Sequence, residues 1–405
     1  MNSEKTMRIL FLAPVVPWPL TQGRNLRNFH LLRILAERHE VELLCGSFDA
    51  GSPALPSEVA ALVEFGEVVA WPGRPLATRL LDMGQSVPDI WQTYASDRLV
   101  DSAWARHATK PFDCVHVAGF EMMGTWNRVR DRLTARIPYV LDEHNIEYSL
   151  RESMQAGEAL SVADVPYRIY NHLQTHRTRR HETGAWQRAW HVSTVSPEDR
   201  AQVLKHVPAH RVSLVPNCLD IRSLPKVERN SVRPHSLLFM GKMDYRPNVA
   251  GVTWFCREAM PVLRERFPDA SFTILGRDPA ADVRTLNDMP GVTVTGYVES
   301  LVPYLEQAAT FVVPLFQGGG TRFKVLEALA TGIPLVSTNQ GIAGLPLENE
   351  THCLLADNPN DLATAIERTW TEPATTWPRV ANGQRLVEAR FDWSAIAPTL
   401  AGIYV

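Results

Sequence analysis

The sequence predicts an α/β protein with two domains, each built on a parallel β-sheet. Short, nearly uninterrupted apolar runs alternate along the chain with segments whose apolar residues recur at helical spacing, which is typical of strand–helix–strand units. Strands that are apolar throughout are buried on both faces, as in parallel sheets. The polar segment Asp220–Pro234 carries two prolines and no periodicity, and it is the best linker candidate. A length of 405 residues agrees with two or three domains.

The N-terminal half opens with one complete strand–helix–strand unit. Met7–Ala13 is a continuous apolar run, Gly23–Arg38 carries a helical stripe of leucine and phenylalanine, and Val41–Cys45 is a second apolar run. The stretch Ile146–Arg188 is expected to be mostly helical. Further strands are expected at Cys114–Val117, Pro138–Leu141, His191–Val195 and Arg211–Val215.

The C-terminal half repeats the pattern and adds a signal for ligand binding. Strands are expected at Ser236–Met240, Ser271–Leu275, Val292–Thr295, Thr310–Val313 and Ile333–Ser337. Four of these strands run directly into Gly241, Gly276, Gly296 or Pro314. In open α/β sheets, ligands bind outside the carboxyl ends of the strands. A small-molecule site is therefore expected there, in a cleft between two domains.

Composition excludes several classes of protein. The 41 Lys and Arg residues nearly balance 44 Asp and Glu residues, which argues against a nucleic-acid binder held by bulk charge. The five cysteines show no CxxC spacing, so the sequence predicts neither a zinc site nor a disulfide framework, and it predicts a reduced, cytoplasmic protein. The longest apolar run, Ile9–Leu20, is 12 residues long with three prolines, so any membrane contact is expected to be peripheral, at the inner face of the membrane.

The strongest motif follows the strand that ends at Pro314. The three glycines Gly318–Gly320 form a loop, and a helix is expected over Thr321–Gly332. Glycines allow a backbone to approach a ligand closely, and a helix N-terminus is a site for anions. Arg322 and Lys324 add full positive charges. This combination predicts a diphosphate site.

Glu327 follows on the same helix, three residues after Lys324. A carboxylate there can accept two hydrogen bonds from a vicinal diol such as a ribose. The alternative is a glycine-rich turn before a core helix, with Glu327 solvated or paired to Lys324.

The motif resembles the donor-site signature of retaining GT-B glycosyltransferases of glycosyltransferase family 4, in its Gly-Gly-Gly-Thr-Arg form. The resemblance covers nearly the whole chain. It implies two Rossmann-like domains whose parallel sheets face each other across a cleft, and transfer of a sugar from a nucleotide-diphosphate sugar with retention and without a metal. Four further segments carry it, namely Pro17–Gly23, Val215–Asp220, Phe239–Asn248 and Phe391–Trp393.

The resemblance also implies which part of the chain forms each domain and what each domain binds. Residues 1–220 are expected to form an acceptor-binding domain and residues 221–385 a nucleotide-sugar-binding domain. Residues 386–405 are expected to form a final helix that crosses back to the first domain.

The sequence departs from the family pattern at two places. The first of two family glutamates falls on Gly319, so the donor sugar is harder to infer. Lys242 stands where the family has an arginine on the diphosphate, and Asn248 stands near a family lysine, for which Arg246 could substitute. Lys242 and Arg246 could also be solvated loop charges. The dinucleotide fingerprint GxGxxG is absent, which argues against NAD or FAD.

Histidines and carboxylates in the N-terminal half complete the predicted site. His116 matches a family histidine beside the sugar, although a strand-end histidine can also have no role. His144 matches a family histidine that faces the acceptor or the sugar, and Glu143, Asn145 and Glu147 are expected to position the acceptor. Alternatively, Asn145 caps a helix that begins at Ile146.

The predicted catalytic residues are His116, His144 and Glu327. The predicted donor-binding residues are Gly23, Lys242, Arg246, Gly296, Val298, Gly319, Gly320, Thr321, Arg322, Lys324 and Glu327. The predicted acceptor-binding residues are Glu143, Asn145 and Glu147. No metal ligand and no cofactor are predicted; cations stabilise the leaving diphosphate instead.

The substrates implied are a UDP-sugar or GDP-sugar and a carbohydrate, lipid-linked or small-molecule acceptor, in glycan, lipid-linked sugar or glycoside biosynthesis. The basic run His176–Glu182 could attract a lipid-linked acceptor, or it is a solvated helix face. Two rival functions remain open: an inactive nucleotide-sugar-binding or scaffold protein, and a sugar-nucleotide epimerase of the same fold.

Overall fold

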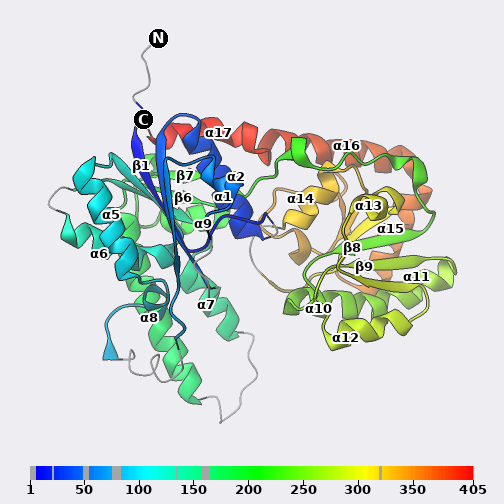
Figure 1. Cartoon of the computed structure of the whole chain (residues 1–405). Coiled ribbons are helices and arrows are strands. Elements are labelled where there is room, and N and C mark those ends of the chain that lie inside the picture. Colours follow the sequence, from blue (N-terminus) through cyan, green and yellow to red (C-terminus); the bar gives the residue numbers. More distant parts are fainter. Residues whose placement is uncertain are drawn as a thin grey trace. The chain divides into compact units, whose positions relative to one another are not determined.

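The computed structural model describes residues 6–20, 22–48, 54–74, 84–133, 136–156, 165–318 and 322–404 (Figure 1). The chain divides into two compact units, Met1–Asn217 with Ala397–Val405, and Cys218–Ile396. Each unit holds one parallel sheet, with seven strands in the first and six in the second. The prediction of two Rossmann-like parallel sheets is confirmed.

The sheet of the first unit has the order β3-β2-β1-β4-β5-β6-β7. Every predicted strand of this half is present, within two residues of its expected ends. The additional strand β3 was not predicted because its sequence, FGEVVA, breaks the apolar run with glycine and glutamate. The strands are β1 Arg8–Ala13, β2 Glu40–Ser47, β3 Phe65–Ala70, β4 Cys114–Ala118, β5 Tyr139–Glu143, β6 His191–Thr194 and β7 Val212–Leu214.

Successive residues of these strands have their side chains on opposite faces of the sheet. Leu10 and Leu12 of β1 join a buried apolar cluster with residues of α5 and α6. Phe11, on the other face, stacks against His116 with ring centroids 4.3 Å apart. Both faces are covered, which explains the apolar strands. The helices are α1 Gly23–Ala36, α2 Ser57–Ala60, α4 Asp89–Thr93, α5 Asp97–Thr109, α6 Met123–Arg132, α7 Glu147–Ala156, α8 Val165–Arg188 and α9 Pro197–Val203.

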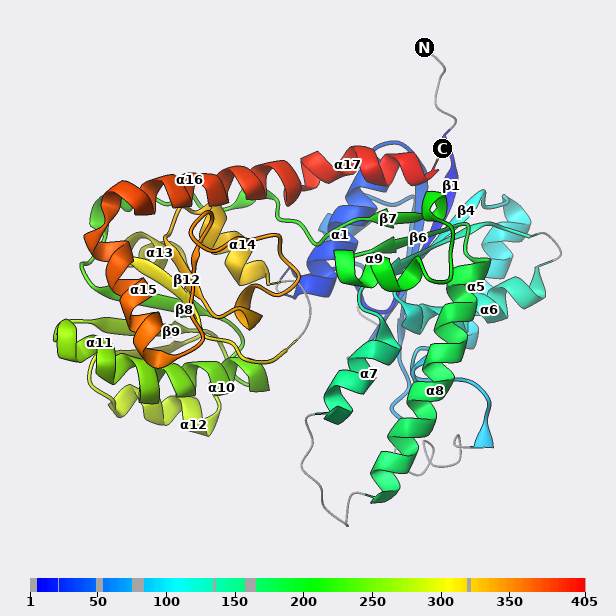
Figure 2. The same ribbon diagram turned by 180° about the vertical axis from the view of Figure 1, so that it is seen from behind.

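The helices α7 and α8 lie side by side below the first sheet (Figure 2). They account for the mostly helical stretch expected over Ile146–Arg188. The basic run His176–Glu182 lies on α8, where His176, Arg179 and Arg180 are exposed and Glu182 is buried. Within the ranges that the structure describes, no helix has the length and apolar character needed to cross a membrane.

The sheet of the second unit has the order β10-β9-β8-β11-β12-β13. The five predicted strands are present, and β13, only two residues long, was not predicted. The strands are β8 Ser236–Met240, β9 Ser271–Leu275, β10 Val292–Gly296, β11 Thr310–Val313, β12 Leu335–Ser337 and β13 Leu354–Leu355. The helices are α10 Arg246–Trp254, α11 Met260–Arg266, α12 Ala281–Arg284, α13 Val302–Gln307, α14 Phe323–Ala330, α15 Pro359–Thr371 and α16 Pro373–Arg390, and α17 Trp393–Ala401 continues into the first unit.

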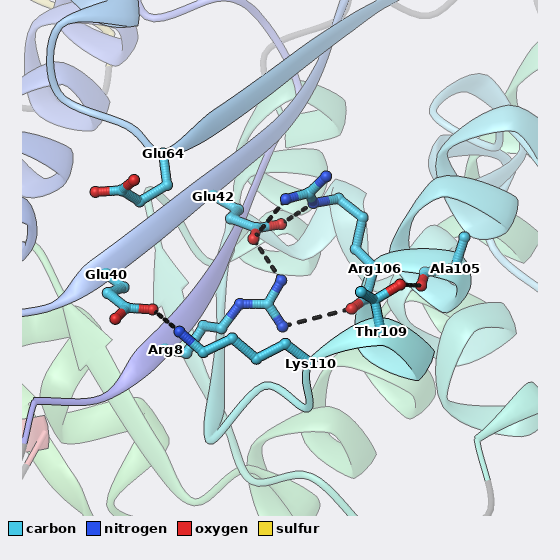
Figure 3. Close-up of a pocket in the computed structure, with 8 residues that line it drawn as sticks. All are labelled: Arg8, Glu40, Glu42, Glu64, Ala105, Arg106, Thr109 and Lys110. Atoms are coloured by element: carbon cyan, nitrogen blue, oxygen red, sulfur yellow. Dashed lines mark hydrogen bonds and ion pairs between the residues drawn. The ribbon is translucent and has the colours of Figure 1, made fainter.

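A charged cavity of about 600 Å³ lies at the amino ends of β1 and β2 (Figure 3). Its centre is the buried carboxylate of Glu42, which accepts hydrogen bonds from Arg8 and Arg106. Burial raises the pKa of Glu42, but the two guanidinium groups outweigh burial and hold the pKa below its usual value. Glu64 lines the same cavity, is exposed, and points away from the arginines. Glu42 therefore ties β1, β2 and α5 together.

Replacing Glu42 by alanine is expected to lower the free energy of unfolding by about 3–5 kcal/mol, because Arg8 would remain buried without a carboxylate. The matched control Glu64→Ala is expected to change it by less than about 0.5 kcal/mol. Urea unfolding at pH 7 measures both. Since the folded-state pKa of Glu42 is depressed, its contribution is full above the unfolded pKa and is lost as the pH falls through the folded pKa. Equal stability losses in the two variants would contradict this role of Glu42.

Candidate active site

A buried ion pair organises the carboxyl ends of β5 and β6 in the first unit. Asp142, at the end of β5, accepts from Arg27 Nε at 2.8 Å and Nη2 at 2.5 Å, and from Ser193 Oγ at 2.6 Å. Arg27 Nη1 also donates to the Val215 carbonyl at 2.8 Å and to Asn217 Oδ1 at 3.1 Å. Burial raises the pKa of Asp142, but the charge and hydrogen bonds of Arg27, together with His144, outweigh burial and hold that pKa well below its usual value. The ionised form of Asp142 is therefore favoured at neutral pH.

His144 is oriented by this anion. Its Nε2 atom lies 3.2 Å from Asp142 Oδ2, and 9% of its side chain is exposed. Its Nδ1 atom has no hydrogen-bond partner among the described residues. Its Nε2 atom likewise forms no hydrogen bond with a described residue, and both ring nitrogens are buried, so the hydrogen-bonding capacity of the ring is unused in this structure.

His116 has a different environment from the one expected of a substrate contact. It lies within β4 with no exposed surface, between Phe11 and the C-terminal Tyr404. The Tyr404 hydroxyl lies 2.5 Å from its Nδ1 atom. Burial lowers the pKa of His116 to about 4. In this conformation the neutral imidazole is part of the core, and its role beside a sugar stays a prediction.

The predicted acceptor residues lie at and after the end of β5, near further carboxylates. Glu143 is buried; its Oε1 accepts from Trp186 Nε1 at 2.6 Å, and its Oε2 has no partner among the described residues. Burial raises the pKa of Glu143 well above its usual value and the pKa of Glu147 to about 7. At neutral pH burial therefore favours the protonated form of Glu143, which can donate as well as accept a hydrogen bond, whereas Glu147 is close to the middle of its titration. Asn145 is half-buried beside them.

Glu182 of α8 was missed by sequence reasoning. Its carboxylate accepts from the backbone N–H groups of Glu147 and Tyr148 at 2.8 and 3.1 Å, which caps the N-terminus of α7. The suggestion that Asn145 caps a helix beginning at Ile146 is therefore wrong, since α7 begins at Glu147. The signal was present, because Glu182 lies on the same helical stripe as the buried Ala185 and Trp186.

The first turn of α1 contributes an ion pair rather than a free cation. Gly23 is the first residue of α1. Arg24 Nη2 lies 3.1 Å from Glu121 Oε1, and Glu121 is buried. The Glu121 charge, stronger than the opposing effect of burial, raises the pKa of Arg24. Arg24 thus neutralises one of the carboxylates near Glu147.

In the second unit, glycines keep the carboxyl edge of the sheet open. A Cβ atom on Gly276 would lie 1.7 Å from the Gly241 carbonyl oxygen. A Cβ atom on Gly241 would lie 2.7 Å from both Lys324 Nζ and Asn248 Nδ2. No side chain therefore fits at Gly276, where the backbone is in the way, and a side chain at Gly241 would displace the ends of Lys324 and Asn248.

Arg322 is hydrogen-bonded to the backbone at Gly318, the first glycine of the predicted donor loop. Its Nη2 atom donates to the Gly318 carbonyl at 2.6 Å and, more weakly, to the Gln340 carbonyl at 3.4 Å. Gly318 has a φ of 104°, which favours glycine. Arg322 is 6% exposed, and burial lowers its pKa. The predicted residues Gly319, Gly320 and Thr321 lie outside the described residues. The helix α14 begins at Phe323, two residues later than expected.

Lys324 and Glu327 lie on the first turns of α14. Lys324 Nζ donates to Asn248 Oδ1 at 2.8 Å and lies 4.1 Å from the centroid of the Phe239 ring. Burial, more than the nearby Arg322 charge, lowers the pKa of Lys324 to about 7. Burial also raises the pKa of Glu327, against the effect of Lys324. Neither group forms an ion pair with a described residue, so this part of the site suits an anion and a hydroxyl-rich partner.

The other predicted donor residues are more exposed. Lys242 Nζ lies 2.9 Å from Asp244 Oδ2, and the two side chains are 53% and 46% exposed. Arg246 is exposed as the first residue of α10. Gly296 ends β10 with a φ of 69°, and Val298 is half-buried after it. The structure thus brings Lys324, Glu327 and Arg322 together on α14 and its N-cap, and leaves Lys242 paired.

Comparison with known proteins agrees with this arrangement. A family model described as "Glycosyl transferase 4-like domain" matches residues 23–218, and one described as "Glycosyl transferases group 1" matches residues 234–372. Glycogen synthase of Mycobacterium tuberculosis (strain CDC 1551) is 27% identical over 207 residues, which is 48% of this chain and 48% of that protein. The chain thus aligns with about half the length of the curated relatives it matches.

Solved structures of similar fold cover nearly the whole chain. Sucrose-phosphate synthase from Thermosynechococcus elongatus superposes with a TM-score of 0.68 at 20% identity, over 98% of each chain. Anabaena Alr3699/HepE, in complex with UDP and glucose, has a TM-score of 0.64 at 15% identity, over 98% of this chain and 99% of that one. At these identities the likeness shows the fold. With both halves matched by glycosyltransferase domain models, the chain belongs to the GT-B glycosyltransferases.

Proposed function

We propose that the chain transfers a sugar from a UDP-sugar or GDP-sugar to an acceptor hydroxyl, with retention and without a metal ion. One observation carries the proposal. Lys324 and Glu327 share the start of α14, a few residues after Gly318, and neither forms an ion pair with a described residue, although each affects the pKa of the other. An ammonium suits a diphosphate, and a carboxylate three residues further on suits the ribose diol.

The chemistry follows from where charge develops. As the sugar leaves, negative charge grows on the diphosphate, and Lys324 would stabilise it, which lowers the barrier. Arg322 would hold the Gly318 carbonyl and hence the loop. We propose that these cations replace a divalent metal. The Anabaena protein of similar fold, solved in complex with UDP and glucose, supports a uridine donor.

The acceptor is proposed to bind the N-terminal unit. His144 offers Nδ1 to the acceptor hydroxyl, and Glu143, Asn145 and Glu147 offer further polar groups. A carbohydrate, lipid-linked or small-molecule acceptor fits this chemistry. We also propose a cytoplasmic location, supported by five cysteines that are all buried, free thiols.

Thermal unfolding with UDP, GDP, ADP and dTDP, with and without EDTA, tests the donor site. One diphosphate is expected to raise the Tm of the wild type, since a ligand at about 100 times its Kd stabilises by about 2.7 kcal/mol. The shift is expected to survive EDTA and to shrink in Glu327→Gln. The control Glu388→Gln, an exposed glutamate of α16, is expected to keep the full shift. No shift with any diphosphate would refute the donor site, and a shift abolished by EDTA would refute metal independence.

A further inference from the structure

Asn248 occupies an unusual position for a buried amide. It lies in the first turn of α10 and is 5% exposed. Its Nδ2 atom donates to the Lys242 carbonyl at 2.8 Å. That bond fixes the carboxamide so that Oδ1 faces the other way, toward Lys324 Nζ at 2.8 Å. Asn248 thereby connects the loop after β8 with α14.

Three contacts determine where the Lys324 ammonium lies. Asn248 holds it from one side, and the Phe239 ring lies 4.1 Å away. The third neighbour is Gly241, where a Cβ atom would come within 2.7 Å of Nζ. The lysine therefore reaches from α14 to the carboxyl end of β8, the edge where α/β sheets bind ligands.

The Lys324 ammonium can donate further hydrogen bonds. A lysine carries three N–H donors, and Asn248 is the one hydrogen-bond acceptor that the described residues give it. The charged groups near it are Arg322 and Glu327 on the same helix and its N-cap, and the Lys242–Asp244 pair on the loop after β8. None of these carboxylates forms an ion pair with Lys324, so its charge is available to a bound anion.

We propose that Asn248 is a positioning residue for Lys324: it aims the ammonium across Gly241 at the donor diphosphate, so that a lysine of α14 supplies the cation on the β8 side of the site. This inference rests on the proposed function. It explains why residue 248 can be an amide, and why Lys242 can remain paired with Asp244 at the surface.

Binding of UDP and GDP by calorimetry between pH 6.5 and 8.5 tests the proposal. In the wild type, affinity for the diphosphate that binds is expected to fall as the pH rises above 7. The Lys324 amine is then increasingly neutral and must take up a proton when the diphosphate binds. Asn248→Ala is expected to weaken binding about tenfold, the loss of one charge-assisted contact. Asn248→Asp is expected to abolish the pH dependence, because the new carboxylate keeps Lys324 charged while competing with the diphosphate.

Asn382 supplies a matched control. Its amide also bridges a backbone carbonyl and a cation, donating to Thr351 O at 3.0 Å and accepting from Arg385 Nη2 at 2.6 Å, but on α16. Asn382→Ala is expected to leave both affinity and its pH profile unchanged.

The results of these binding measurements test two claims separately: that a donor site exists, and that Asn248 positions Lys324 in it. If the wild type binds neither UDP nor GDP, the proposed function fails. If it binds one and Asn248→Ala keeps the wild-type affinity and pH profile, the positioning role is refuted while the donor site stands. An Asn248→Ala protein with a lower Tm but an unchanged affinity and pH profile refutes the positioning role as well.

Discussion

Replacing Lys324 by methionine is expected to lower kcat for sugar transfer about 100- to 1000-fold, the usual effect of removing one group that stabilises developing negative charge. The protein should remain folded. Methionine keeps the apolar stem beside Phe239, and the half-buried ammonium forms no ion pair with a described residue. The Tm of the variant is therefore expected to equal or exceed that of the wild type.

Lys242→Met is the matched control for this experiment. Lys242 is also a lysine at the carboxyl edge of the second sheet, but it is exposed and paired with Asp244. Its replacement is expected to change kcat less than about threefold, because exposed ion pairs contribute little. Steady-state kinetics on both variants decide which lysine contacts the diphosphate. Equal losses of kcat in the two variants would contradict the special role proposed for Lys324. They would instead support the diphosphate-binding role that the sequence predicted for Lys242.

Replacing Asp142 by alanine is expected to lower the free energy of unfolding of the N-terminal unit by about 3–5 kcal/mol. Arg27 has 1% of its side chain exposed and would keep two neutral acceptors but no counter-charge. His144 would also lose the atom that orients it. Chemical denaturation followed by circular dichroism measures the effect.

Asp97→Ala provides the control, because Asp97 is 83% exposed and pairs with the exposed Arg128. Its loss is expected to cost less than about 1 kcal/mol. In the double variant Asp142→Leu with Arg27→Met, much of the stability should return, since neither charge is left unpaired. An Asp142→Ala variant as stable as Asp97→Ala would show that the pair does not organise the sheet edge.

The architecture was predictable because buried parallel strands are visible in the sequence as apolar runs. Every strand expected from such a run is present, whereas β3, with a glycine and a glutamate, and the two-residue β13 left no such signal. The helix α14 was predictable for a similar reason, since glycine before a helix N-terminus forms a local pattern.

What the sequence could not predict are partnerships between distant residues. Arg27 lies one turn before Leu31 on the buried stripe of α1, which indicated a buried partner but could not name Asp142, 115 positions away. Tyr404 reaches His116 from the other end of the chain. The bond between Asn248 and Lys324 likewise joins two helices that only the folded sheet brings together.

One measurement tests the central claim most directly: proton NMR of the purified protein mixed with UDP-sugars or GDP-sugars and a panel of carbohydrate acceptors. We predict that one nucleotide sugar is consumed in the presence of EDTA, that the new glycosidic bond keeps the donor's anomeric configuration, and that Lys324→Met nearly abolishes both. A wild-type protein that consumes no donor, or that forms the inverted product, would contradict the proposed retaining, metal-independent transfer.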